Sequence, residues 1–244
     1  MQLMAFDHQY KNWNQVLGEY VVTQGPQTRV KYRALKKNPA KLEAFLKEAS
    51  DVTKEDFSNF TREQQISFLV NYYNALVVKL IYPEIYGIDE IDDIGGIFSD
   101  PFARNFFTLF GEETELKSIM EQLRTDFNEP RVHFALCNSA RSGASLRGEA
   151  YVAEQLEAQL EDQARNYIND RNKVAFQSGR PARLFISSVF EEFRTDFAPD
   201  EAGLRAFILR YLSLDDDEVR DQIQRKTTFL VYGRQNWSLN RAQE

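Results

Sequence analysis

Apolar side chains recur at every third or fourth position over much of this chain, which is the spacing of one face of an α-helix. The pattern predicts helices over residues 10–20, 39–49, 61–82, 116–127, 152–167, 188–197 and 204–212. The helix over residues 61–82 begins with Thr61 and Gln64, which have the spacing of a capping box. Because this helix is apolar on most sides between positions 68 and 81, we expect it to be the most buried helix.

Shorter apolar runs between turn residues predict a small number of β-strands. Strands are expected as two hairpins and one last strand, over residues 106–110, 114–116, 173–176, 183–186 and 227–232. Residues 132–136 fit either a strand or a tight helix. The sequence therefore predicts a helix-rich α+β fold, a single domain over residues 1–244 around a small antiparallel or mixed sheet.

Composition narrows the possible functions. The 30 basic and 37 acidic residues are spread evenly, so we expect no nucleic-acid partner. The single cysteine, Cys137, excludes an intrachain disulfide, and the only histidines, His8 and His133, exclude a multi-histidine metal site. A metal site that joins both histidines with Asp7 would span too much of the chain to carry weight, so we expect no metal and no cofactor.

The sequence shows no sign of a membrane span, because no apolar run approaches the roughly 18 residues that one needs. Residues 1–9 also lack the basic start and apolar core of a signal peptide. Two explanations stay open. Either the protein is not exported by that route and is cytoplasmic, or its signal peptide has been removed and Met1 is a remnant of cloning.

Two amides, Asn71 and Asn74, lie within the most apolar predicted helix. A buried amide has to be hydrogen-bonded. We expect both side chains to bind the backbone of residues 137–145, and we include them among the candidate ligand-binding residues.

One segment departs from the alternation of core and surface residues. Residues 131–147 form a loop rich in small residues, in which the candidate site residues are His133, Cys137, Asn138, Ser139, Arg141, Ser142 and Arg147. The backbone N–H groups of such a loop could hold an anion, with arginines as further donors. The first hypothesis is a binding site for a small anionic molecule or a peptide, lined by His133 with Ser139, Arg141 and Ser142 at its mouth.

The second hypothesis is an enzyme of the acyl-transfer or peptide-hydrolase type. It would use Cys137 or Ser139 as nucleophile and His133 as base. Cys137 directly follows Leu136 and lies close to Phe134, which indicates that its side chain is buried. Because burial in apolar surroundings raises the pKa of a thiol, we expect Cys137 to be unreactive.

Several short motifs along the chain become specific only when they are taken together. They are Phe6-Asp7-His8, Trp13, Arg29-Val30-Lys31-Tyr32, Asn71-Tyr72-Tyr73-Asn74-Ala75-Leu76, Arg131-Val132-His133-Phe134-Ala135-Leu136, Leu146-Arg147-Gly148-Glu149-Ala150-Tyr151, Phe190-Glu191-Glu192-Phe193-Arg194-Thr195-Asp196-Phe197 and Trp237-Ser238-Leu239-Asn240. With these motifs the chain resembles, nearly from end to end, the bacterial branch of the domain of unknown function 547 family. That family is uncharacterised, so the resemblance implies a fold and not a reaction. Many bacterial members look exported, which favours a periplasmic protein whose signal peptide has been removed.

The chain departs from the family at the positions that could carry thiol chemistry. Members read His-Phe-Ala-Leu, one residue and Cys, followed by a second Cys before Pro-Pro-Leu, whereas Asn138 and Gly143 stand at these two cysteine positions here. Members also often have Glu-His in the preceding helix, where this chain has Met120 and Glu121. The resemblance therefore implies a catalytically degenerate ligand- or peptide-binding module, with the thiol- or serine-type hydrolase as the alternative.

Overall fold

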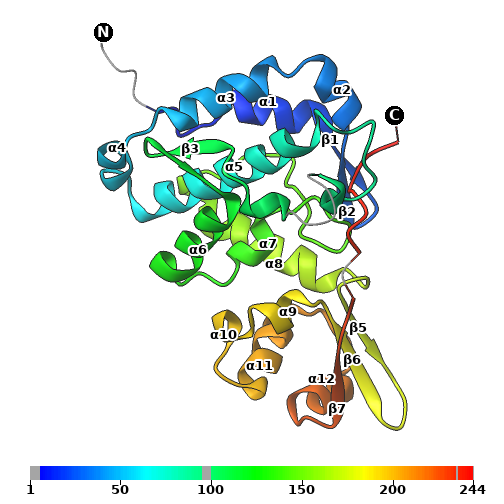
Figure 1. The fold of residues 1–244 in the computed structure, drawn as a ribbon. Coiled ribbons are helices and arrows are strands. Elements are labelled where there is room, and N and C mark those ends of the chain that lie inside the picture. The colour runs from blue at the N-terminus through cyan, green and yellow to red at the C-terminus, as the bar shows by residue number, and fades with distance from the viewer. Residues whose placement is uncertain (1–5, 95–99, 235, 244) are drawn as a thin grey trace.

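The computed structural model describes residues 6–94, 100–234 and 236–243, and part of the signal-peptide expectation, which falls on residues 1–5, lies outside them. The chain forms a larger and a smaller lobe (Figure 1). The larger lobe contains α1 (Lys11–Tyr20), β1 (Val21–Gln24), β2 (Gln27–Val30), α2 (Tyr32–Lys37), α3 (Ala40–Ser50), α4 (Lys54–Ser58), α5 (Arg62–Ile81), η1 (Ile91–Asp93), η2 (Pro101–Ala103), β3 (Phe107–Leu109), β4 (Glu112–Thr114), α6 (Leu116–Phe127), α7 (Val132–Ala135), η3 (Ala153–Gln155) and α8 (Leu156–Asn169). The smaller lobe contains β5 (Val174–Gln177), β6 (Ala182–Ile186), α9 (Val189–Glu192), α10 (Arg194–Phe197), α11 (Glu201–Tyr211), α12 (Asp217–Gln224) and β7 (Thr228–Tyr232).

The long helix α5 lies at the centre of the larger lobe. Its capping box is confirmed, because Thr61 Oγ1 accepts the N–H of Gln64 at 3.2 Å and Gln64 Oε1 accepts the N–H of Thr61 at 2.9 Å. Most of its residues are buried, with α3 packed on one side and α6 on another (Figure 1). The expectation of a central buried helix is therefore confirmed.

Both hairpins of the larger lobe turn on residues with positive φ. The predicted β3–β4 hairpin is confirmed, and Phe110 and Gly111 form its two-residue turn with φ of 54° and 86°. The β1–β2 hairpin was not predicted, because Gly25 and Pro26 between its strands indicate only a helix break in the sequence. Gly25 has a φ of 64°, a conformation that glycine adopts without strain.

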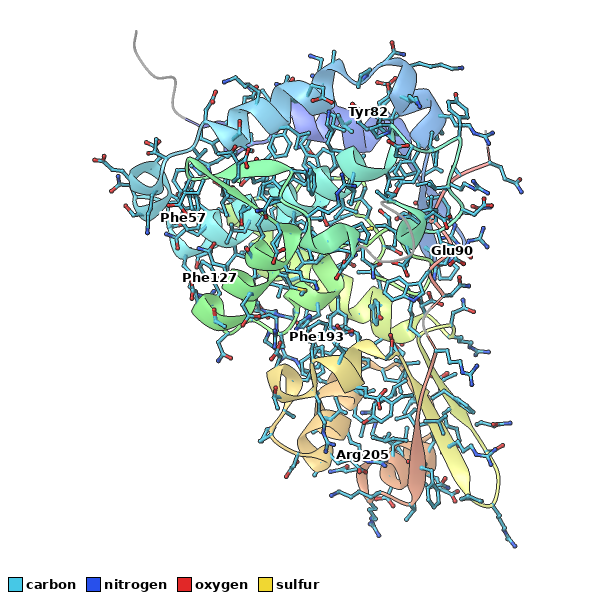
Figure 2. The ribbon with its side chains drawn as sticks, in the orientation of Figure 1. Phe57, Tyr82, Glu90, Phe127, Phe193 and Arg205 are labelled. Atoms are coloured by element: carbon cyan, nitrogen blue, oxygen red, sulfur yellow. The ribbon has the colours of Figure 1, made fainter. Side chains whose placement is uncertain are left out.

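The smaller lobe is a mixed three-stranded sheet with helices beside it. β5 and β6 pair antiparallel, and β6 and β7 pair parallel, so the mixed sheet and the α+β class are confirmed. The buried Arg205 of α11 joins helix to strand, because its guanidinium donates to the oxygens of Ile223 and Thr228 (Figure 2). The single helix predicted over residues 188–197 is two short helices, α9 and α10, which are separated at Phe193.

The two lobes are joined by segments far apart in the sequence. α8 contributes buried side chains to the apolar clusters of both lobes. After β7 the chain returns to the larger lobe, where residues 236–242 run beside β2 (Figure 1). Backbone hydrogen bonds of 2.8–2.9 Å hold this segment, from Leu239 N to Asp89 O, from Asn240 N to Ser139 O and from Ala242 N to Val30 O.

Over the described ranges, no helix combines the length and the apolar character that crossing a membrane requires.

The two amides of α5 each bracket an irregular stretch of backbone. Asn71 donates to Tyr151 O at 2.7 Å and accepts the Tyr151 N–H at 3.0 Å. Asn74 donates to Ala135 O at 3.0 Å and accepts the Cys137 N–H at 2.8 Å. The expectation is confirmed for Asn74, which reaches the start of residues 137–145, and is wrong for Asn71, which binds residue 151 instead.

We expect Asn74→Leu to lower the free energy of unfolding by about 1–3 kcal/mol, because a buried carbonyl and a buried N–H would each lose their partner. Urea denaturation of the purified variant measures this loss. Asn166→Leu, at an exposed position of α8, is the matched control and should change the stability by less than about 0.5 kcal/mol. Equal stabilities for the two variants would contradict the role that we assign to Asn74.

Candidate functional site

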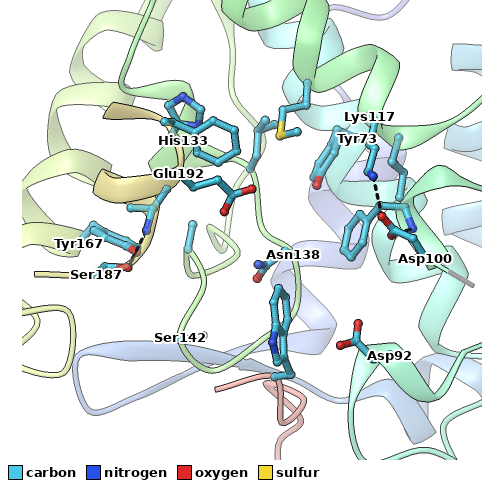
Figure 3. A pocket seen from close by; sticks show the side chains of 18 residues that line it. Tyr73, Asp92, Asp100, Lys117, His133, Asn138, Ser142, Tyr167, Ser187 and Glu192 are labelled. Carbon is cyan, nitrogen blue, oxygen red and sulfur yellow. Dashed lines mark hydrogen bonds and ion pairs between the residues drawn. The ribbon is translucent and has the colours of Figure 1, made fainter. Parts of the chain in front are cut away.

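A cavity of about 710 Å³ lies between the two lobes (Figure 3). The larger lobe supplies side chains from α5, α6 and α7, the smaller lobe supplies those of residues 187–193, and the C-terminal segment supplies Trp237. Aromatic rings form much of the wall, namely Tyr73, Phe102, Tyr167, Phe193 and Trp237. A cavity of this size and lining is typical of sites for small organic ligands.

The charged groups in this wall are mainly acidic. The wall contains the carboxylates of Asp92, Asp100 and Glu192 and a single ammonium. This ammonium, of Lys117, is bound to Asp100 at 2.6 Å (Figure 3). Burial alone would raise the pKa of Asp100, but the hydrogen bond and charge of Lys117 leave it below its ordinary value. Burial raises the pKa of Glu192. The wall therefore has an excess of negative charge.

His133 lies at the junction of the lobes with 2% of its side chain exposed. Its ring stacks on Phe193 with 4.3 Å between the centroids. Its Nε2 lies 2.7 Å from Asp196 Oδ2. The carboxylate of Asp196 is held by Arg124, with Nε at 2.5 Å from Oδ2 and Nη2 at 3.0 Å from Oδ1. The larger lobe thus contributes the histidine and the arginine, and the smaller lobe contributes the acid between them.

The environment of His133 favours a neutral ring. Burial lowers its pKa, and the opposing effect of Asp196 is smaller. The hydrogen bond from Arg124 holds the pKa of Asp196 below its ordinary value, so this carboxylate is ionised at neutral pH. A neutral ring beside an ionised Asp196 donates through Nε2 and keeps Nδ1 as its basic nitrogen. This is the arrangement of a histidine that a carboxylate orients.

The loop after α7 brings only part of its candidate residues to the cavity. Asn138 and Ser142 line it together with His133. Asn138 Oδ1 accepts the N–H of Ala140 at 3.1 Å, and Ser142 Oγ accepts the N–H of Asn236 at 2.8 Å. The loop is thereby fixed both to itself and to the C-terminal segment.

Asn138 and Gly143, which both depart from the pattern that the sequence resemblance implies, are adjacent in space. A Cβ atom on Gly143 would lie 1.8 Å from Asn138 Oδ1 and 2.7 Å from Asn138 Cγ. The amide of Asn138 therefore fills the space that a side chain at position 143 would need. In α6, Met120 lines the cavity with an apolar side chain.

The proposed nucleophiles lie outside the cavity wall. Cys137 and Ser139 are 2% and 1% exposed, and neither lines the cavity. The Cys137 sulfur accepts the N–H of Ser139 at 3.4 Å and lies 3.6 Å from Asn240 Nδ2, while the Ser139 hydroxyl accepts from Tyr32 at 2.9 Å. The expectation that Ser139 lies at the mouth beside His133 is thus not met, because its side chain turns into the core.

The arginines of this segment are also absent from the cavity wall. Arg131 binds Glu129 and Glu157, and Arg147 binds Glu149 and Asp162. Arg141 was expected at the mouth, but it lines a different cleft. Asn71 and Asn74 are buried brackets of the backbone and do not reach the cavity. Among the described residues, no three His, Cys, Asp or Glu side chains are grouped so that they could hold a metal ion.

Residues that sequence reasoning did not propose complete the site. They are Tyr73, Asp92, Asp100, Lys117, Arg124, Glu192, Phe193, Asp196 and Trp237. Glu192, Phe193, Asp196 and Trp237 lie in motifs that carried the family resemblance, and that was the available signal. No pattern along the sequence pairs them with His133, because they lie in segments distant from it in the chain.

Comparison with known proteins relates the central segment of the chain to one protein family. Residues 57–168 match the model of the family described as "Protein of unknown function, DUF547". This segment extends from α4 to α8 and includes His133 and the loop after it. The resemblance to this family is therefore confirmed over residues 57–168. Neither the curated proteins nor the solved structures contain a match to this chain.

We expect the His133 ring to titrate below pH 6.5, because burial outweighs the effect of Asp196. Asp196→Asn should lower the pKa further and Arg124→Met should raise it, since Asp196 raises and Arg124 lowers the value in the folded protein. NMR titration of the imidazole protons measures both shifts. His8, the other histidine, is the internal control and should not respond to either change.

The same shift has a consequence for stability. A histidine whose pKa is lower in the folded state stabilises the fold above its unfolded pKa, and that contribution is lost as the pH falls below about 6.5. An Asp196→Asn variant whose His133 pKa is unchanged or higher would contradict this account of the histidine.

We expect the folded protein to react slowly with a thiol reagent, because burial raises the pKa of Cys137 and hides its sulfur. Labelling followed by mass spectrometry should be slow at pH 7 and should become fast and stoichiometric in denaturant. Cys137→Ser provides the blank. Fast labelling of the folded protein would instead favour the hydrolase hypothesis.

Proposed function

We propose that the chain is a ligand-binding module and that its ligand occupies the cavity between the lobes. The ligand, a small molecule or a peptide segment, combines an aromatic or aliphatic group with a positive charge. The observation that carries this proposal is the wall itself, in which aromatic rings surround three carboxylates and one ammonium. Aromatic faces and carboxylates both attract cations.

The carboxylates available to such a ligand are Glu192 and Asp92. Within the part of the chain that the structure describes, neither takes part in an ion pair, whereas Asp100 is engaged with Lys117. Glu192 projects into the cavity on the same side as His133 (Figure 3). Its raised pKa reflects loss of water around the carboxylate, and a bound cation would supply the missing charge.

The anionic guest suggested by the sequence is disfavoured at this cavity. The arginines that were to bind it are either paired with carboxylates or directed to another cleft. An anion would also meet the excess negative charge of the wall, which like-charge repulsion makes unfavourable. The peptide part of the original hypothesis is retained, in the form of a segment with a basic or amino group.

The alternative function is the acyl-transfer or peptide hydrolase. Its support is the histidine that Asp196 orients, which has the geometry of a general base. The nucleophiles that the sequence offers, Cys137 and Ser139, are buried outside the cavity, so the binding function has the stronger support.

Three ligands that share a phenyl group test the proposal by isothermal titration calorimetry. We expect phenethylamine to bind more tightly than phenethyl alcohol, and 3-phenylpropionate to bind most weakly. Glu192→Gln should weaken phenethylamine binding by about fivefold, which is the effect of one partly exposed ion pair. It should leave the affinity for the neutral alcohol unchanged.

The neighbouring Glu191 is the matched control, because it is exposed and does not line the cavity. Glu191→Gln should bind all three ligands as the wild type does. The reverse order of affinities, with the carboxylate tightest, would overturn the proposal, as would an equal response of both glutamine variants.

A further inference from the structure

A second cleft, of about 370 Å³, is lined by three arginines from distant parts of the chain. Arg33 comes from the first turn of α2, Arg141 from the loop after α7, and Arg241 from the C-terminal segment. The protein as a whole has a net charge of −7, so this gathering of positive charge does not follow from composition. None of its arginines lines the cavity between the lobes.

The backbone at Arg141 and Arg241 is held firmly. The Arg141 N–H donates to Ser238 O at 2.9 Å, and its carbonyl accepts from Gln27 Nε2 at 3.3 Å and from Lys173 Nζ at 3.2 Å. Arg241 pairs with Val30 in a parallel bridge. Donors on a fixed backbone lose less conformational freedom on binding a ligand.

The positive charge of this cleft is only partly balanced. Arg241 binds the exposed Asp89 at 2.6 Å. In the described part of the chain, Arg141 takes part in no ion pair, in contrast to Arg131 and Arg147, which bind two or more carboxylates each. Burial and, to a smaller degree, the charge of Arg141 lower the pKa of Arg29.

An aromatic ring lies beside the cleft. Tyr86 is 62% exposed, and Arg33 Cζ and Lys36 Nζ lie 5.6 Å and 4.9 Å from the centre of its ring. Ile85, which precedes it, lines the cleft. An anion bound to the arginines could therefore place an attached organic group against Tyr86.

We infer that Arg33, Arg141 and Arg241 form a binding site for a phosphate monoester. Guanidinium groups match the oxygens of a phosphate in geometry and charge. The negative charge of such a group would meet the guanidinium of Arg141, which takes part in no ion pair in the described part of the chain. This site is separate from the cavity of the proposed function and does not depend on it.

Phosphate binding is tested with phenyl phosphate, inorganic phosphate and sodium chloride at equal ionic strength, by isothermal titration calorimetry. We expect phenyl phosphate to bind at least as tightly as inorganic phosphate, and chloride to give no saturable signal. Arg141→Ala should weaken phosphate binding by about tenfold or more, as loss of a charge-assisted hydrogen bond does. Arg33→Ala should act in the same direction.

The matched control is Arg183→Ala, an exposed arginine of β6 in the smaller lobe, which removes the same charge far from the cleft. Because Arg141 is exposed, its variant should fold, and an unchanged circular dichroism spectrum checks this. Phosphate binding that is the same in Arg141→Ala, Arg33→Ala and the wild type would overturn the inference. So would a signal that chloride reproduces.

The phosphate could belong to a free metabolite or to a lipid headgroup, and a second arm separates these sources. Vesicles of phosphatidylcholine with and without phosphatidic acid are sedimented with each variant. Binding only to the vesicles with phosphatidic acid, lost in Arg141→Ala and kept in Arg183→Ala, supports the site and assigns it to a headgroup. Calorimetric binding without sedimentation supports it for a soluble ligand, and no Arg141-dependent binding in either arm overturns it.

Discussion

The structure depends on hydrogen bonds to a buried stretch of irregular backbone. Between α7 and α8 the chain passes through the interior with little helix or strand, so its N–H and C=O groups need partners from elsewhere. Side chains of other elements supply them, namely Asn14, Gln27, Thr28, Asn71, Asn74, Gln159, Gln163 and Lys173. These contacts hold the loop against α5, α8 and β2, and they fix the positions of His133, Asn138 and Ser142 at the cavity.

This constraint explains which parts of the fold could be predicted from the sequence. Helix α5, its capping box and the β3–β4 hairpin depend on residues close together in the chain, and all were predicted. The β1–β2 hairpin was missed because a glycine and a proline end a helix as readily as they turn a strand. The break at Phe193 was missed because this ring stacks on His133, a contact across the lobes that no local pattern records.

The site, like the fold, could be predicted from the sequence only in part. The loop after α7 was identified from its composition, and His133, Asn138 and Ser142 do line the cavity. Its acidic wall was not foreseen, because Asp92, Asp100 and Glu192 look like ordinary surface carboxylates in the sequence. In the sequence, Asn138 and Gly143 stood out only through the pattern that the family resemblance implies. Its spatial reason, an amide that fills the volume above the glycine, required the structure.

The loop after α7 and the C-terminal segment form a wall that lines two separate spaces. Ser142 lines the cavity between the lobes, and Arg141, the residue before it, lines the arginine cleft. The same holds for the C-terminal segment, in which Trp237 and Arg241 face the two spaces. An occupant of one face that displaced this wall would change the space on the other face. Thermodynamic reciprocity then requires that each occupant alter the affinity for the other by the same factor, so the wall is the element through which the two spaces would communicate.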